Sequence, residues 1–393
     1  LFTGFLIGLS NGINVLVARF YGARHADDVK KTVHSALLVS IAAGVLLLLI
    51  GLLGSPALLH LLNTKEDLYP GAVLYLRVYF LGMPALALYN YGNAIFSAIG
   101  ETKKPLYYLC IAGVLNILLN LFFVIVCHLA AAGVALASII SQYISAALVI
   151  LSLRRSGSVV RLERSMLRIE PHKAKQVLSL SIPAGLQNAI FAIANLFIQA
   201  GVNSFDELMV EGNAAAANVG NFVYQAMNTF QQAVTCFAGQ NIGARKPRRV
   251  LTSMYVCLFW AFSFGVVLGL LSCAFGAQLL SLYSTDADVI QVGLNRMYFV
   301  CGPYFLCGIM DVMTGVLRGI GYSLLPMIVS LMGACVFRIF WVMTVFAANR
   351  TMDCLMLSYP VSWALTFAVL VTIFTVLWKK VQKRYTPEEL AAR

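Results

Sequence analysis

The stretch VHSALLVSIAAGVLLLLIGLLGSPALLHLL, residues 33–62, contains no Asp, Glu, Lys or Arg. A second stretch of the same kind is MYVCLFWAFSFGVVLGLLSCAFGAQLLSLY, residues 254–283. Each is longer than the roughly 20 apolar residues that an α-helix needs to cross the hydrocarbon core of a membrane. Of the 393 residues, 60% are hydrophobic and 11% are charged, whereas a soluble domain carries about 25% charged residues. The sequence therefore predicts an all-α polytopic membrane protein.

Eleven membrane spans are expected from the apolar runs and from the turn and charge signals between them. Their approximate ranges are 1–20, 33–61, 71–98, 106–127, 130–153, 177–203, 212–241, 252–283, 288–317, 324–348 and 355–378. Alternate breaks between these spans hold nearly all the Lys and Arg, and the opposite breaks hold only Lys65 and Arg350. The positive-inside rule then places the basic breaks and the basic C-terminus in the cytoplasm. It also accounts for the net charge of +12 without a nucleic-acid partner.

Short motifs recur in the same order in the two halves of the chain. YGAR at 21–24 returns as IGAR at 242–245, which places Gly22 and Gly243 at an offset of 221 (243 − 22). The later pairs are RVYFLGMP with RMYFVCGP, which aligns Arg77 with Arg296 and Pro84 with Pro303, and AIGETKKP with GIGYSLLP, which aligns Gly100 with Gly321. All the repeated loops lie on the basic side, so the halves are predicted to be parallel repeats about an axis along the membrane normal.

The repeat predicts the domain organisation. Residues 1–153 form an N-terminal lobe, 154–176 a cytoplasmic linker and 177–393 a C-terminal lobe with a short basic tail. The span at 177–203 has its partner 221 residues earlier, before Leu1, so we expect two six-helix bundles of which eleven of twelve spans are present. Two such bundles are typical of transporters that bind a substrate between the lobes and rock around it.

Polar amides lie along one face of the span at 212–241. Their spacing of three and four residues places them in one helical stripe: Asn218, Asn221, Gln225, Asn228, Gln232 and Thr235. The preceding span adds Gln187, Asn188, Asn195 and Gln199. We interpret the stripe as the wall of a hydrated substrate cavity; hydrogen bonding between helices is the alternative, and it is preferred for the isolated pair Asn116 and Asn120.

Four charged residues lie deep in the predicted spans, where such groups face the protein interior. Asp311 is the acid among them, and we consider that it either exchanges a proton or cation, or pairs with Arg338 of the next span. Arg77 and Arg296 are expected to snorkel or to bond backbone carbonyls. No cofactor or metal is expected, because the His, Cys, Asp and Glu residues show no ligand spacing.

The chain resembles the multidrug and toxic compound extrusion (MATE) family. The residues that carry the resemblance are NVLVARFYGAR (14–24), VLNILLNLFFV (114–124), AAGVALASIISQ (131–142), SIPAGLQN (181–188), FAGQNIGAR (237–245) and GVLRGIGYSLLP (315–326). The resemblance implies a two-lobed antiporter that expels organic cations in exchange for sodium ions or protons. Family members often carry a coupling acid in a first span, and some carry a Glu where residues 183–197 here have only amides. The resemblance also implies that Asp311 matches an Asp that some members carry in the tenth span.

These observations favour a multidrug efflux antiporter and not an enzyme. We expect it to act as a monomer among membrane lipids and to export small organic compounds that are cationic and amphipathic. The alternative is a flippase for a lipid-linked precursor from the same broader superfamily, which would need a cationic cavity for a phosphate headgroup. A membrane-embedded enzyme is disfavoured, because the five histidines have no acid or Cys partner at suitable spacing.

Overall fold

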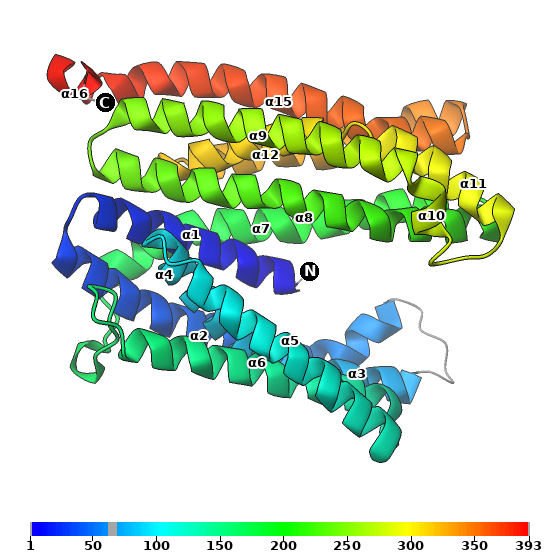
Figure 1. Cartoon of the computed structure of the whole chain (residues 1–393), viewed down its shortest axis with the longest axis horizontal. Coiled ribbons are helices and arrows are strands. Elements are labelled where there is room, and N and C mark those ends of the chain that lie inside the picture. Colours follow the sequence, from blue (N-terminus) through cyan, green and yellow to red (C-terminus); the bar gives the residue numbers. More distant parts are fainter. Residues whose placement is uncertain (1, 62–68, 392–393) are drawn as a thin grey trace. The chain divides into compact units, whose positions relative to one another are not determined.

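The computed structural model describes residues 2–61 and 69–391, and nearly all of them lie in helices or short turns (Figure 1). Contacts between the helices divide the chain into two compact units, one of residues 2–185 and one that begins at Leu186. The boundary falls inside one long helix, α7 (Pro171–Val202). The lobe boundaries predicted near residues 153 and 177 stay a prediction.

The first unit contains the N-terminal helices. They are α1 (Phe2–Gly22), α2 (Ala26–Leu61), α3 (Tyr69–Leu81), α4 (Met83–Ala98), α5 (Lys103–Leu121), a π-helical turn at Phe122–Val126, α6 (Ala130–Arg154), a 3₁₀ turn at Arg164–Met166 and the first part of α7. The α1–α2 turn, the α4–α5 turn and the C-terminal end of α6 lie at one end of this bundle (Figure 1).

The second unit contains the rest of α7 and the later helices. They are α8 (Glu207–Gly243), α9 (Pro247–Ala274), α10 (Gly276–Leu280), α11 (Ala287–Arg296), a π-helical turn at Met297–Cys301, α12 (Tyr304–Gly319), α13 (Leu324–Ser330), α14 (Phe337–Trp341), α15 (Met352–Gln382) and α16 (Pro387–Ala391). Further π-helical turns at Leu331–Val336 and Val342–Phe346 flank α14.

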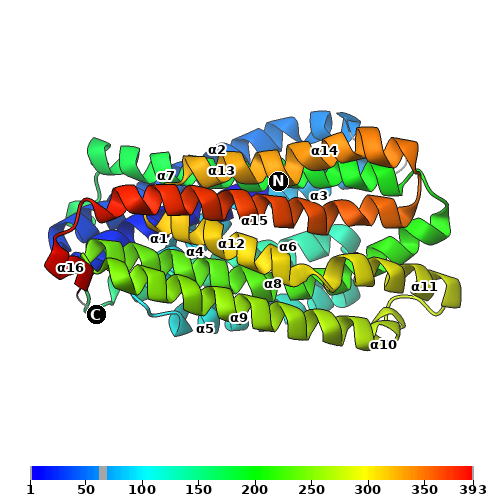
Figure 2. The same ribbon diagram turned by 90° about the horizontal axis from the view of Figure 1, so that it is seen from above.

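The two units repeat the same pattern of helix packing. In the first unit α4 packs against α1, α2 and α6, and in the second α12 packs against α8, α9 and α15. Subtracting 221 from the bounds of α8, α9, α12 and α15 gives ranges that overlap α1, α2, α4 and α6. The views in Figures 1 and 2 agree that α12 lies among its three partners. The predicted internal repeat is therefore confirmed in the packing within each unit.

Backbone geometry repeats at the same offset. Arg24 and Arg245, 221 residues apart, have φ angles of 58° and 55°, and Gly100 and Gly321 have 85° and 101°. Each pair closes its turn with equivalent hydrogen bonds: the amide of Arg24 donates to the Tyr21 carbonyl, and the amide of Arg245 donates to the Ile242 carbonyl. Left-handed backbone is strained for any residue except glycine, so the duplication has kept the same unusual turn twice.

Gly100 offers a test of this turn. Alanine at Gly100 would meet no atom within 4 Å, but its φ of +85° disfavours any side chain. We expect Gly100→Ala to reduce the free energy of unfolding by roughly 1–2 kcal/mol and so to lower the thermal unfolding midpoint in detergent.

Gly113 is the matched control, because it lies inside α5 and a Cβ there would also meet nothing within 4 Å. Gly113→Ala should leave the midpoint unchanged or raise it, since alanine favours a helix over glycine. Equal losses in the two variants would contradict the strain argument.

One pair of repeated spans is broken where the sequence predicted a continuous helix in each half. The predicted span 71–98 is divided into α3 and α4 next to Pro84, and the predicted span 288–317 is divided into α11 and α12 at Pro303. Proline has no N–H to donate and its ring clashes with the carbonyl four residues earlier. The prolines that mark the repeat therefore also place a bend in both halves.

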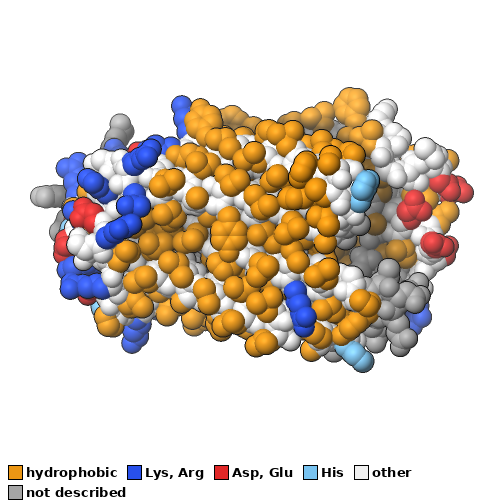
Figure 3. All heavy atoms as spheres, turned by 90° about the horizontal axis from the view of Figure 1, so that it is seen from below, with side chains coloured by type: hydrophobic (Ala, Val, Ile, Leu, Met, Phe, Trp, Pro, Cys, Tyr) orange, Lys and Arg blue, Asp and Glu red, His pale blue; other side chains and the backbone are white. Residues whose placement is uncertain are grey.

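The outer surface of the helices is hydrophobic. In the view of Figure 3, apolar side chains cover the middle of the face, most Lys and Arg gather at one end, and Asp and Glu are seen at both ends. In the described part of the chain, ten helices or helix pairs are long and apolar enough to cross a membrane. The prediction of a polytopic all-α membrane protein is confirmed, although α8 is not among those ten: it has 37 residues, but its amides lower its mean hydropathy.

The segment between α6 and α7 is bound to α2. The amide of Glu163 donates to Nε2 of His34 at 2.9 Å, and the amide of Glu170 donates to the Ser35 hydroxyl at 3.1 Å. The other ring nitrogen of His34 is 2.7 Å from the Lys30 carbonyl. Since Nε2 accepts, Nδ1 must carry the proton, so the bonds define a neutral tautomer.

The start of α7 packs closely on α1 within the first unit. A Cβ built on Gly8 would lie 2.4 Å from the backbone of Gly185, so the two helices cross at a pair of glycines. The Ser181 hydroxyl donates to the Leu9 carbonyl at 2.7 Å nearby. Small residues allow this close approach, as is common where membrane helices pack.

Replacement of His34 tests the attachment of this segment. His34→Phe removes the acceptor for Glu163, so trypsin should cut at Arg161 or Arg164 several times faster than in the unmodified protein. His172→Phe is the control, because His172 is exposed and, among the described residues, bonds Gln176 alone, one turn further along α7. Equal cleavage of both variants would show that His34 does not hold the segment.

Candidate functional site

Helix α12 carries the most buried charged residues of the second unit. Every residue from Met310 to Gly319 is buried. Gly315 and Gly319 allow α8 to approach, because a Cβ on Gly315 would lie 2.7 Å from the Gln231 carbonyl oxygen. The hydroxyl of Thr235, the last residue of the predicted stripe, donates to the Gly315 carbonyl at 3.1 Å.

Asp311 lies on α12 with 8% of its surface exposed. Its Oδ2 atom is buried and makes no hydrogen bond among the described residues. Tyr224 of α8, Cys307 one turn earlier on α12 and Arg318 two turns later are near enough to interact with it electrostatically. Because an unpaired buried carboxylate oxygen is costly, this position favours a proton or a bound cation.

Arg318 follows the predicted span 288–317 and so falls in one of the predicted basic breaks, but the structure places it in the interior with 4% exposed. Its Nη2 donates to the Oε1 of Gln187 on α7 at 2.5 Å, while its Nε is buried without a partner in the described chain. It makes no ion-pair contact with Asp311, although seven residues of helix place both on one face. The spacing of seven residues was the sequence signal that places Arg318 and Asp311 on the same face of α12.

Gln187 was predicted to line a cavity, and here its amide oxygen holds the buried guanidinium of Arg318. Gln187→Leu would leave that charge without its acceptor, at a cost of about 1–3 kcal/mol. We therefore expect a lower thermal unfolding midpoint in detergent, whereas Gln187→Glu should keep the midpoint.

Gln199 is the matched control on the same helix. It is exposed, and its amide bonds Asn203 one turn later at 2.8 Å. Gln199→Leu should change stability by less than about 0.5 kcal/mol. A Gln187→Leu variant as stable as Gln199→Leu would show that the bond to Arg318 contributes little.

Arg338 forms no ion pair with Asp311. The predicted alternative, in which Asp311 pairs with Arg338 of the next span, is therefore not seen among the described residues. Its Nε donates to the Ser362 hydroxyl at 2.9 Å. Its guanidinium lies 4.3 Å from the ring centre of Tyr359 and 5.7 Å from that of Trp363. A hydrogen bond and two aromatic faces thus stabilise this buried charge.

The amide stripe of α8 faces away from the helices that pack on it. Asn218, Asn221, Gln225 and Gln232 are exposed, and Asn228 is half-buried. None of these five side chains makes a hydrogen bond within the described chain. On α7, Asn195 and Gln199 are exposed and Asn188 is half-buried. By contrast, Asn120 donates to Asn116 at 3.0 Å, which in turn is 3.4 Å from Ser138 of α6.

The residues that mark the internal repeat lie away from Asp311. Arg296 donates to the Asn213 carbonyl at 2.7 Å, so it joins α11 to α8. Its repeat mate Arg77 is exposed on α3. Gly22 and Gly243 are the last residues of α1 and α8. These positions shape the turns and do not surround Asp311.

A bundle of membrane helices with a duplicated core and buried ionisable side chains belongs to the class of membrane transporters. Residues 1–122 and 183–344 match the family model named MatE. This chain is a member of the MatE family, whose members are transporters and not enzymes.

Known relatives agree with this assignment. The probable multidrug resistance protein YoeA of Bacillus subtilis (strain 168) is 23% identical over 97% of this chain and 84% of its own length. A protein of Shewanella oneidensis named as an FAD transporter is 26% identical over 72% of this chain and 64% of its own length. A crystal structure of MATE in complex with MaL6 has the same fold, with a TM-score of 0.91 and 17% identity over 97% of this chain and 86% of that one.

Proposed function

We propose that the protein is a secondary antiporter that exports organic, cationic and amphipathic compounds in exchange for sodium ions or protons. The observation that carries this proposal is Asp311, a buried carboxylate with an unpartnered oxygen in the helix that the other helices of its unit surround. A multidrug resistance protein among the relatives supports export of varied compounds. We infer an inner-membrane location with the basic loops in the cytoplasm, and action as a monomer.

Exchange follows from competition for one negative charge. A carboxylate in this environment is stable when a proton, a sodium ion or an organic cation neutralises it. Binding of the substrate cation would displace the coupling ion, and binding of the coupling ion would displace the substrate. Arg318, two turns away, would stabilise the empty carboxylate during the change of conformation.

The remaining predicted residues have supporting roles. The predicted amide side chains of α7 and α8 would line the substrate path, where they would bind water and hydrogen-bond to the substrate. Aromatic and Met side chains would accept ligands of different shape, since such side chains repack. The parallel repeat supports rocking of two lobes around a central cavity.

An organic anion is the second candidate substrate. One relative is named as an FAD transporter, and Arg318 and Arg338 are buried cations that an anionic group could approach. The flippase alternative needs the same cationic cavity. Arg338, however, is already held by Ser362 and two aromatic rings, which favours the cationic substrate.

Efflux from cells that express the protein tests the proposal. Cells are loaded with a panel of fluorescent cationic dyes, and FAD in the medium is measured in parallel. We expect dye efflux in the unmodified protein and at least a tenfold loss in Asp311→Asn, because the neutral amide cannot exchange a cation. Varying sodium and pH separately identifies the coupling ion.

Asp353→Asn is the control, since Asp353 is an exposed acid in the first turn of α15. It should transport like the unmodified protein. Normal efflux by Asp311→Asn would remove this residue from the coupling step. Export of FAD without any dye would favour the anionic substrate.

A further inference from the structure

The connecting segment, residues 155–170 between α6 and α7, depends on one histidine for part of its attachment to α2. Its backbone donates two hydrogen bonds to that helix, from Glu163 to Nε2 of His34 and from Glu170 to the Ser35 hydroxyl. All four residues belong to the first unit. His34 is only 1% exposed, so water reaches its ring only when the segment moves away.

The bond between His34 and Glu163 requires a neutral imidazole. Nδ1 of His34 lies 2.7 Å from the Lys30 carbonyl and donates to it, which leaves Nε2 to accept from the Glu163 amide at 2.9 Å. Protonation places a hydrogen on Nε2, and an imidazolium has two donors and no acceptor. Two donors would then face each other at a buried position, which is unfavourable. A charged His34 therefore cannot keep this contact.

The elements around His34 carry many ionisable side chains. The acids are Asp27 and Asp28 of α2, with Glu163 and Glu170 of the connecting segment. The other groups are Arg19 and Arg24 of α1, Lys30 and Lys31 of α2, Tyr91 of α4, Arg154 of α6, Arg155, Arg161, Arg164 and Arg168 of the segment, and His172 and Lys173 of α7. Three of the acids already pair with a Lys or Arg, and none pairs with His34 in the described chain. A protonated His34 thus has no carboxylate partner in this arrangement.

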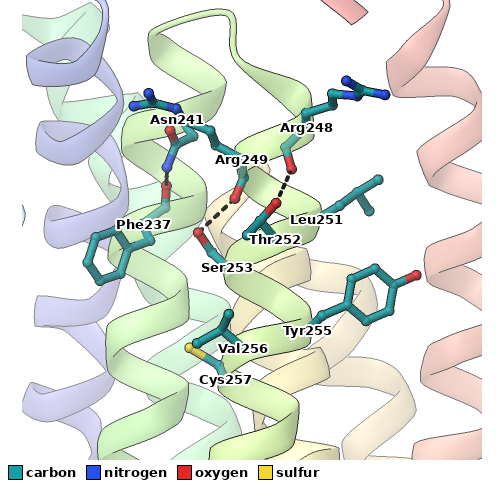
Figure 4. A pocket seen from close by; sticks show the side chains of 10 residues that line it. All are labelled: Phe237, Asn241, Arg248, Arg249, Leu251, Thr252, Ser253, Tyr255, Val256 and Cys257. Carbon is teal, nitrogen blue, oxygen red and sulfur yellow. Dashed lines mark hydrogen bonds between the residues drawn. The ribbon is translucent and has the colours of Figure 1, made fainter. Parts of the chain in front are cut away.

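The duplicated helix in the second unit lacks this chemistry. At the repeat offset of 221, His34 corresponds to Tyr255 of α9 (255 − 34) and Ser35 corresponds to Val256. Figure 4 shows these two side chains in the lining of a pocket of about 880 Å³ between α8 and α9. Neither side chain gains a proton in mild acid, and Tyr255 is 62% exposed. A buried histidine at this position is therefore not required by the repeated fold.

The other attachments of the segment keep their charge when a histidine is protonated. Nζ of Lys173, at the start of α7, is 2.6 Å from the carboxylate of Asp28 and 3.8 Å from the ring centre of Phe20. The bond from Glu170 to Ser35 involves no ionisable atom. Histidine ordinarily titrates near about pH 6.5, and carboxylates near about pH 4. Mild acid thus acts on the Glu163 contact and leaves the start of α7 attached.

We propose that His34 makes the attachment of the connecting segment pH-sensitive: neutral His34 holds Glu163 on α2, and protonation of His34 releases it. The segment leads directly into α7, the helix that begins in the first unit and ends in the second. Acid on the basic side of the protein would therefore lengthen the free connection between the two units. The device needs no transported compound and is independent of Asp311.

Hydrogen–deuterium exchange of the purified full chain in detergent tests this inference. Exchange is measured at about pH 7.5 and about pH 5.5, on either side of the ordinary titration of histidine, and corrected for the intrinsic rate at each pH. Peptides that contain Glu163 should lose roughly tenfold in protection at the lower pH, because their amide loses its acceptor. Peptides that contain Glu170 are the internal control and should keep their protection.

Three variants separate the charge of His34 from its shape. His34→Gln keeps an acceptor that cannot be protonated, so the Glu163 peptides should stay protected at both pH values. His34→Phe has no acceptor and should leave them unprotected at both. His25→Gln is the control, because His25 is an exposed histidine 3.5 Å from Asp28, and it should exchange like the unmodified protein.

Three results would overturn the proposal, and the first needs only the unmodified protein. It is equal protection of the Glu163 peptides at both pH values. The second is a loss in acid that persists in His34→Gln, which would assign the effect to another group. The third is greater protection in acid, which would show that the imidazolium pairs with the Glu163 carboxylate and tightens the segment.

Discussion

The hydrocarbon core of a membrane offers no partner to a peptide N–H or carbonyl, so the chain must satisfy its own backbone. Helices satisfy it within each span. At the ends of α1, α4, α8 and α12 the same need is met by a left-handed residue that closes the last turn, at Arg24, Gly100, Arg245 and Gly321. Buried hydroxyls follow the same rule: Ser141 donates to the Ala137 carbonyl one turn earlier in its own helix. The interior therefore contains few polar groups without a partner, and the exceptions are informative.

Three of the seven exceptions in the described part of the second unit lie on α12, at Asp311, Thr314 and Arg318. This helix is surrounded by α8, α9 and α15, and the small residues Gly315 and Gly319 permit the close contact with α8. Asp311 and Arg318 lie in that close-packed environment, and each has a buried atom without a hydrogen bond in the described chain. The packing of α8, α9 and α15 around α12 fixes the positions of these two groups. A selective ion or substrate site requires such fixed positions.

The fold could be predicted from the sequence because the patterns that define it extend over many residues. Apolar runs predicted the spans, and motifs 221 residues apart predicted a duplication that the backbone of Arg24 and Arg245 repeats. The bends at Pro84 and Pro303 were missed, because proline was treated as a landmark and not as a break in the helix. One predicted basic residue, Lys65, lies outside the described residues.

The site was less predictable, because it depends on which side of a helix faces which neighbour. Sequence spacing grouped Gln187 with the amides of a cavity, but only packing shows that it bonds Arg318. Arg318 is near the end of a span, where an arginine is ordinarily solvated, so its burial could not be read from its position. The partner of Arg338 is Ser362, a residue that has no charge and that no charge pattern would indicate.

The polarity of α8 also affects how the protein is made. A segment enters the bilayer from the translocon according to its own hydrophobicity, and α8 is the long helix whose amides place it below the level of the ten apolar spans. Helix α9 follows after a turn of three residues, from Ala244 to Lys246, and is strongly apolar. The two helices pack against each other, so we expect α8 to insert together with α9 as a helical hairpin, because the apolar α9 favours insertion. The order of synthesis therefore makes α8 and α9 before α12, the helix that packs against both of them.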